Sequence, residues 1–187
     1  MADAERWIKP YGTLKKRLYI DQICAAHDGK AARGTAYGQV RSSQASSTIA
    51  IHAPADAVWR VISDFGAACQ YLDMVVNCTV EGEGVGALRT LTFADGGTLV
   101  ERLEALDEVA RRLSYTLLSD TPLSDTPFRE CLTTVTVHYL GPSQAEVAWS
   151  ATFEPDVLPP DEAVELLERA FELNGQALRN FMAASAP

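Results

Sequence analysis

The feature that most constrains this chain is an uninterrupted amphipathic segment near its C-terminal end, residues 161–182. Pro159 and Pro160 precede the segment, Asp161 is a suitable N-cap, and acidic residues occupy the expected first turn. At about 1.5 Å per residue the helix would be roughly 33 Å long, so its apolar stripe needs an equally long partner. That stripe comprises Val164, Leu167, Phe171, Asn174, Leu178 and Phe181.

One polar side chain, Asn174, lies within this apolar stripe. A buried amide without hydrogen-bond partners costs about 1–3 kcal/mol, so something must satisfy it. Two interpretations stay open: a core amide satisfied by neighbours or water, and a polar group that faces a cavity.

Composition limits the class of protein. The 187 residues, 47% of them hydrophobic, suit one domain with an appendage. The sequence has no run of eighteen apolar residues and no signal-peptide pattern at its N-terminus, so we expect a cytoplasmic protein without integral membrane contact. The four cysteines and three histidines show no metal-ligand spacing, so we expect free thiols, no metal and no cofactor.

The net charge of −9 is unevenly distributed. Residues 1–47 carry eight Lys or Arg against four Asp or Glu, so the remainder carries −13. Such an acidic body argues against a nucleic-acid partner, because phosphate contacts supply most of that affinity. We interpret residues 1–46 as a basic, partly flexible arm and linker with a short helix near Leu14. The arm could fold onto the body, touch an anionic surface or do neither.

The central part of the chain reads as strands separated by turns. Period-two alternation begins at Ser47, Pro54 ends that strand, and short helices are expected over residues 55–63 and 68–71. Six further strands are expected over residues 76–81, 87–93, 98–106, 113–118, 129–140 and 145–154. The pattern predicts an α+β fold in which a curved, seven-stranded antiparallel sheet wraps around the C-terminal helix. This geometry favours an apolar cavity between the two.

Several separated motifs resemble one superfamily. The run IHAPADAVWRVISDFG (51–66) is similar to the opening of helix-grip proteins, which include START lipid-transfer domains and polyketide cyclase/dehydrases. The segments EGEGVGALRTLTF, TLVERLEALDEVARRLSYTLL, LTTVTVH and LNGQALRNF resemble the abscisic-acid-receptor-like branch and its bacterial relatives. The resemblance covers about residues 47–183, the expected ligand-binding domain.

The resemblance also implies roles for particular residues. In the plant receptors, a Glu of the ERL motif and an Asn of the last helix hold ligand polar groups through water, and their matches here are Glu101 and Asn174. The receptors' carboxylate-binding Lys corresponds to Leu72. Their gate and latch signatures are replaced at residues 94–98 and 121–124. A ligand cavity is therefore implied, whereas abscisic acid as ligand and a phosphatase as partner are not favoured.

Strand alternation gives further candidates for the cavity. If Glu101 faces inward, so do Leu103 and Ala105. Arg89 belongs to the inward set of its own strand, and matching the family places Arg129 inward, although either Arg could instead lie at the rim with a solvated head. His138 has the opposite parity and, like His52, is interpreted as structural. The expected ligand-binding residues are Leu72, Leu91, Phe93, Leu103, Tyr115, Leu117, Cys131, Phe171, Asn174 and Leu178.

Two functions of different classes fit these residues. The first is a polyketide cyclase/dehydrase-like protein of secondary metabolism, with Glu101 as acid or base and Arg89 or Arg129 holding a developing anion. The second is a carrier or sensor that binds a lipid-like or hormone-like molecule without changing it. Both imply a small hydrophobic partner, and a weak homodimer is an open alternative to a monomer.

Overall fold

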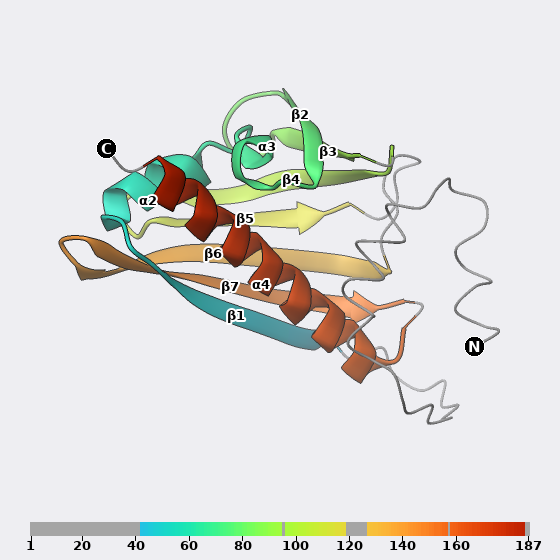
Figure 1. Cartoon of the computed structure of the whole chain (residues 1–187). Coiled ribbons are helices and arrows are strands. Elements are labelled where there is room, and N and C mark those ends of the chain that lie inside the picture. Colours follow the sequence, from blue (N-terminus) through green and yellow to red (C-terminus); the bar gives the residue numbers. More distant parts are fainter. Residues whose placement is uncertain (1–41, 95, 119–126, 157, 186–187) are drawn as a thin grey trace.

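The computed structural model describes residues 42–94, 96–118, 127–156 and 158–185. In it, one antiparallel sheet bends around a long helix, with two short helices after the first strand (Figure 1). The predicted helix-grip architecture is confirmed. The helix expected near Leu14 and the loop of residues 121–124 lie outside the described residues.

The sheet has seven strands in the order β1-β7-β6-β5-β4-β3-β2. Every pairing is antiparallel, and from β2 to β7 each strand pairs with the next one in the chain. The first strand is the exception, because it pairs with the last strand and forms one edge of the sheet. The strands are β1 (Ser43–Ile51), β2 (Val75–Glu81), β3 (Leu88–Phe93), β4 (Thr98–Asp107), β5 (Arg112–Leu117), β6 (Phe128–Gly141) and β7 (Gln144–Pro155).

β1 begins earlier than the sequence predicts. Ser43 already pairs with Phe153 of β7, whereas the alternation of apolar residues becomes visible only from Ser47. The preceding residues are small and polar, with little strand preference of their own. Pairing with β7 therefore extends β1 beyond its own apolar pattern.

The three described helices are α2 (Ala55–Ser63), α3 (Ala68–Tyr71) and α4 (Pro160–Ala184). The prediction that Asp161 caps α4 is wrong, since Pro159 occupies the N-cap and provides no side-chain cap. Pro160 is helical because its fixed φ suits the first turn, where a missing N–H costs nothing. Asp161 instead lies inside the first turn, where its charge still favours the helix dipole.

α4 lies diagonally across the concave face of the sheet, over β1 and β7 (Figure 1). Its buried side includes Leu167, Phe171 and Leu178, together with Gly175. A Cβ at Gly175 would lie 2.9 Å from Cγ2 of Ile49, closer than real Cβ contacts allow. A residue without a side chain therefore lets the helix touch β1 directly.

The buried residues form two clusters. The larger one fills the space between α4, α2 and strands β6 and β7, and includes an edge-to-face pair of Phe128 and Phe153 with ring centroids 5.0 Å apart. The smaller one gathers Ala68, Leu72 and Leu91 beneath α3. Burial on this concave side supplies most of the stabilisation of such a fold.

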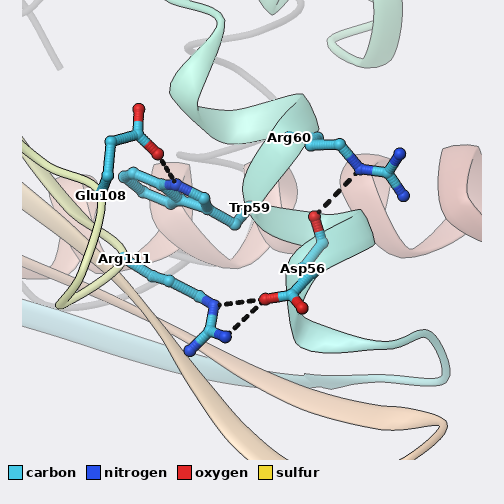
Figure 2. A network of polar contacts seen from close by, with 5 residues as sticks. All are labelled: Asp56, Trp59, Arg60, Glu108 and Arg111. Atoms are coloured by element: carbon cyan, nitrogen blue, oxygen red, sulfur yellow. Dashed lines mark hydrogen bonds and ion pairs between the residues drawn. The ribbon is translucent and has the colours of Figure 1, made fainter.

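A polar network fastens α2 to the turn between β4 and β5 (Figure 2). The indole Nε1 of Trp59 donates a 2.6 Å hydrogen bond to Glu108, and Arg111 donates from Nε to the Asp56 carboxylate at 2.8 Å. Arg60 only reaches back to the carbonyl oxygen of Asp56 in its own helix. The network therefore fixes the position of α2 over one end of the sheet.

Replacing Trp59 by Phe tests this attachment. We expect Trp59→Phe to lower the free energy of unfolding by about 1 kcal/mol, because it removes a hydrogen bond to an exposed carboxylate while keeping an aromatic ring. Urea denaturation measures the change. Arg60→Ala is the control and should change stability by less than about 0.5 kcal/mol. Equal losses in the two variants would contradict a special role for the Trp59 contact.

Candidate functional site

A buried ion pair lies on the concave face where β3 and β4 meet. Arg89 and Glu101 are cross-strand partners, and their side chains are only 9% and 8% exposed. Nε of Arg89 donates to Oε2 of Glu101 at 2.8 Å, and Nη2 donates a second, shorter bond to the same oxygen. Removing either partner would leave an uncompensated charge in a poorly hydrated place.

The Arg89 guanidinium is also held by groups outside β4. Nη1 donates a 2.9 Å hydrogen bond to the backbone carbonyl oxygen of Phe65, in the turn after α2. The guanidinium carbon lies 4.2 Å from the centroid of the Phe65 ring and 5.3 Å from that of Tyr115. Hydrogen bonds and contacts with two aromatic rings therefore fix the cation.

Two tyrosines lie close enough to this pair for both charges to act on them. Burial raises the pKa of Tyr115 well above its ordinary value, and the Glu101 carboxylate adds to the rise while Arg89 opposes it. Burial likewise raises the pKa of Tyr71, with Arg89 opposing it. Both phenols therefore stay protonated at neutral pH and can act as hydrogen-bond donors.

Cys131 lies on β6 within the same buried region. Burial raises the pKa of its thiol to about 11, although a hydrogen bond with Thr133 opposes the rise. Reactivity of a thiol depends on its thiolate form. This cysteine is therefore a packing residue rather than a nucleophile at neutral pH.

Thiol labelling should separate Cys131 from the exposed Cys69. A pKa near 11 instead of 9 reduces the thiolate fraction at pH 8 by about 100-fold, and burial blocks access further. We expect a maleimide to modify Cys69 quickly and Cys131 only when the protein unfolds, as peptide mass spectrometry would reveal. Labelling of both at one rate in the folded protein would refute the prediction.

Most of the sequence-predicted site residues lie on the concave side, in or against the two buried clusters. Arg89, Glu101 and Leu103 are buried, and so are Leu72, Leu91, Cys131, Phe171 and Leu178. Phe93, Tyr115 and Leu117 are partly buried and pack against the clusters. His52 and His138 are exposed.

The structure corrects the expected position of Arg129. Its side chain is 63% exposed and forms a 2.8 Å ion pair with Asp156 instead of facing inward. The reason is an irregularity in β6: the register with β7 shifts between Arg129 and Leu132, and Glu130 has a positive φ of 46°. An inserted residue of this kind reverses the alternation on one side of it.

The expected inward position of Ala105 is also wrong, because β4 has an irregularity of its own. The register of β4 against β5 shifts between Leu103 and Ala105, and Ala105 is exposed although Leu103 is buried. Inward alternation along β4 therefore holds at Glu101 and Leu103 and fails beyond them.

Asn174 is partly buried, and its side-chain amide makes no hydrogen bond with any described residue. Its neighbour Gly175 occupies the contact with β1 instead. The side-chain amide is therefore not held by the described protein atoms, and at its partly buried position either water or a ligand can satisfy it.

Sequence reasoning missed two contributors to the site, Phe65 and Tyr71. Phe65 contacts Arg89 through its backbone oxygen and its ring. It follows Asp64, and the sequence pattern there indicates only the end of a helix. Tyr71 ends a helix of four residues, too short to show periodicity. The available signal was the presence of aromatic residues on both sides of that short helix.

A different hollow, of about 520 Å³, opens on the outer face of the sheet. Its outward-facing side chains on β1, β6 and β7 alternate with the buried Ala45 and Ala151, and none of them is titratable. They are Gln44, Ser46, Leu132, Thr134, Ser150 and Thr152. Buried charge and aromatic groups coincide on the concave face, so that face is the candidate site.

Comparison with known proteins assigns the chain to a family. The model of the family described as polyketide cyclase / dehydrase and lipid transport matches residues 42–184, which include every described strand and helix. This chain is a member of that family. The family name joins two activities, chemical conversion and transport, so membership leaves the choice between them to the site.

Similar proteins match different shares of this chain. Abscisic acid receptor PYL2 of Arabidopsis thaliana is 40% identical over 70 residues, or 35% of this chain and 37% of the receptor. The match thus spans little more than a third of that curated relative. An uncharacterised protein of Bacillus thuringiensis has a TM-score of 0.67 at 25% identity, covering 75% of this chain and 99% of that one.

A second similar structure belongs to an enzyme. The Zhui aromatase/cyclase of a Streptomyces species has a TM-score of 0.60 at 22% identity, covering 77% of this chain and 93% of that one. At this identity the likeness establishes the shared fold alone.

Within the described ranges, no three His, Cys, Asp or Glu side chains are grouped so that they could hold a metal ion. None of the described helices combines the length and apolar character that crossing a membrane requires.

Proposed function

We propose that this family member binds a small hydrophobic molecule between the concave face of the sheet and α4, and converts it as a polyketide cyclase or dehydratase would. The observation that carries the proposal is the buried Arg89–Glu101 pair, bordered by the phenols of Tyr71 and Tyr115 in apolar surroundings. Titratable groups with perturbed pKa values in apolar surroundings cluster at sites that recognise or transform a ligand.

The arrangement offers simple acid–base chemistry. Glu101 could take a proton from a carbon next to a carbonyl group, and a phenol hydroxyl could stabilise the enolate oxygen that forms. Holding a flexible chain in one folded conformation would supply much of the remaining acceleration. Arg129 has no part in this proposal because it lies at the surface.

A carrier or sensor is the second candidate, and one observation favours it. Glu101 already accepts two hydrogen bonds from Arg89, which makes it a stable, fixed acceptor rather than a mobile base. Similarity to a hormone receptor points the same way.

Binding is tested by filling the proposed site from the helix side. Ala177 is partly buried on α4 beside Leu72 and Leu91, whereas Gln176 is exposed. We expect Ala177→Phe to weaken binding of the neutral fluorescent probe N-phenyl-1-naphthylamine by about tenfold or more, which corresponds to 1.4 kcal/mol. Gln176→Phe is the matched control and should leave binding unchanged, and circular dichroism checks that both variants fold. Failure of the wild-type protein to bind the probe would contradict the proposal.

Conversion is tested on the natural ligand. Native mass spectrometry of protein purified from its own host would identify a co-purified molecule. We expect Glu101→Gln to reduce turnover of that molecule by about 100-fold, because a positioned acid or base contributes at least that much. If the wild-type protein does not convert the molecule, and Glu101→Gln binds it as tightly as the wild type does, the carrier is favoured.

A further inference from the structure

The chemistry of the ligand follows from which polar atoms around the buried pair are already used. Three hydrogen bonds occupy Arg89: two to Glu101 and one to the Phe65 carbonyl oxygen. Its guanidinium carbon lies over the rings of Phe65 and Tyr115. These hydrogen bonds use three of its five N–H groups, so one on Nη1 and one on Nη2 are left, but its positive charge is already compensated by Glu101.

Only one oxygen of the Glu101 carboxylate accepts hydrogen bonds from the described residues. Both bonds from Arg89 arrive at Oε2, and Oε1 has no hydrogen bond to any described residue. The side chain is 8% exposed, so bulk water reaches it poorly. A carboxylate oxygen in such a place needs a donor, and a hydroxyl or N–H group would supply one.

The two phenols provide the opposite kind of group. Neither Tyr71 nor Tyr115 makes a hydrogen bond with its hydroxyl to another described residue. Both remain protonated at neutral pH, so each has a donor that is free for an acceptor atom. Donor and acceptor capacity are thus left over next to each other.

The charges nearest the site cancel. Arg89 and Glu101 compensate one another, whereas Arg102 and Glu104 pair with each other on the other side of β4. A ligand carboxylate that reached the phenols would come to lie beside the Glu101 carboxylate without a free cation to balance it. Repulsion between like charges in a poorly hydrated place is costly.

We propose that the site selects an uncharged molecule that carries a hydroxyl group, and rejects carboxylates. The hydroxyl hydrogen would bind Oε1 of Glu101, and an oxygen of the same molecule would accept from Tyr71 or Tyr115. This inference rests on the proposed function and narrows its ligand.

Three small aromatic probes of one shape test the selection: 2-naphthol, 2-naphthoate and naphthalene, titrated at pH 7 in a calorimeter. We expect 2-naphthol to bind about tenfold tighter than either of the others, because only it satisfies Oε1 without adding charge. Glu101→Gln leaves the Arg89 charge uncompensated, so this variant should lose the preference for 2-naphthol and bind 2-naphthoate about tenfold tighter than the wild type does. Glu104→Gln, on the other face of the same strand, should leave all three affinities unchanged.

The outcomes distinguish this inference from the proposed function. Wild-type protein that binds 2-naphthoate as tightly as 2-naphthol, while still binding N-phenyl-1-naphthylamine, would overturn the selection but keep the binding site. A second way to overturn it is a Glu101→Gln variant, folded by circular dichroism, that gains no affinity for 2-naphthoate. Wild-type protein that binds none of the four compounds would overturn the proposed function, and the selection with it.

Discussion

Replacing Arg89 by Met should lower the free energy of unfolding by about 3–5 kcal/mol, the range observed when one partner of a buried ion pair is removed. The expected loss is large because the Glu101 carboxylate would keep its burial and lose both hydrogen bonds from the guanidinium. The Phe65 carbonyl oxygen would also lose its donor. Guanidinium denaturation of the purified variant measures the effect.

Two further variants show whether the loss comes from the unpaired charge. The double variant Arg89→Met/Glu101→Leu should regain most of the stability, because apolar pairs often replace buried ion pairs without loss. Arg102→Met breaks the exposed pair with Glu104 on the same strand and should cost at most about 1 kcal/mol. A double variant no more stable than Arg89→Met would show that the loss arises from packing instead.

The second large effect is expected where α4 touches β1. Gly175→Val should lower the free energy of unfolding by about 1–3 kcal/mol, because its Cβ would lie 2.9 Å from Ile49 Cγ2. The usual gain from removing a glycine inside a helix, about 0.5–1 kcal/mol, works against this loss and is too small to cancel it. Thermal or urea denaturation gives the sign directly.

A second-site change tests the contact. Ile49→Ala alone should destabilise the protein, yet combined with Gly175→Val it should cost less than the two single changes added together. Gln176→Val, one position along on the exposed side of α4, serves as control and should stay within about 0.5 kcal/mol of the wild type. Strict additivity of the Ile49 and Gly175 changes would argue against a direct clash.

The architecture was predictable because period-two and helical patterns are long and regular in this chain. Residues 161–182 predict α4, and alternation correctly groups the buried Arg89 with Leu91 and the buried Glu101 with Leu103. The inward position of Cys131 came from the resemblance to the family, which also placed Arg129 inward, and only Cys131 is buried. Parity alone, however, does not show that Arg89 and Glu101 touch. Their contact depends on the register between β3 and β4, which the geometry of the intervening turn determines.

Both failures arise from the backbone, which the pattern of side chains does not reveal. Arg129 points outward because Glu130 adopts a positive φ. This conformation is uncommon outside glycine, so the identity of the residue does not predict it. The missed contribution of Phe65 comes largely from a carbonyl oxygen, which every residue possesses. Side-chain patterns therefore located the wall of the site, but not the backbone groups that complete it.

The pairing of β1 with β7 has a consequence for how the chain is made. Ser43 is synthesised long before its partner Phe153, and Ile49 before the Gly175 that covers it. During translation, β1 therefore cannot pair until β7 has been made, and Ile49 stays uncovered until Gly175 has been made. We expect this edge of the sheet to form late, after the β2–β6 meander.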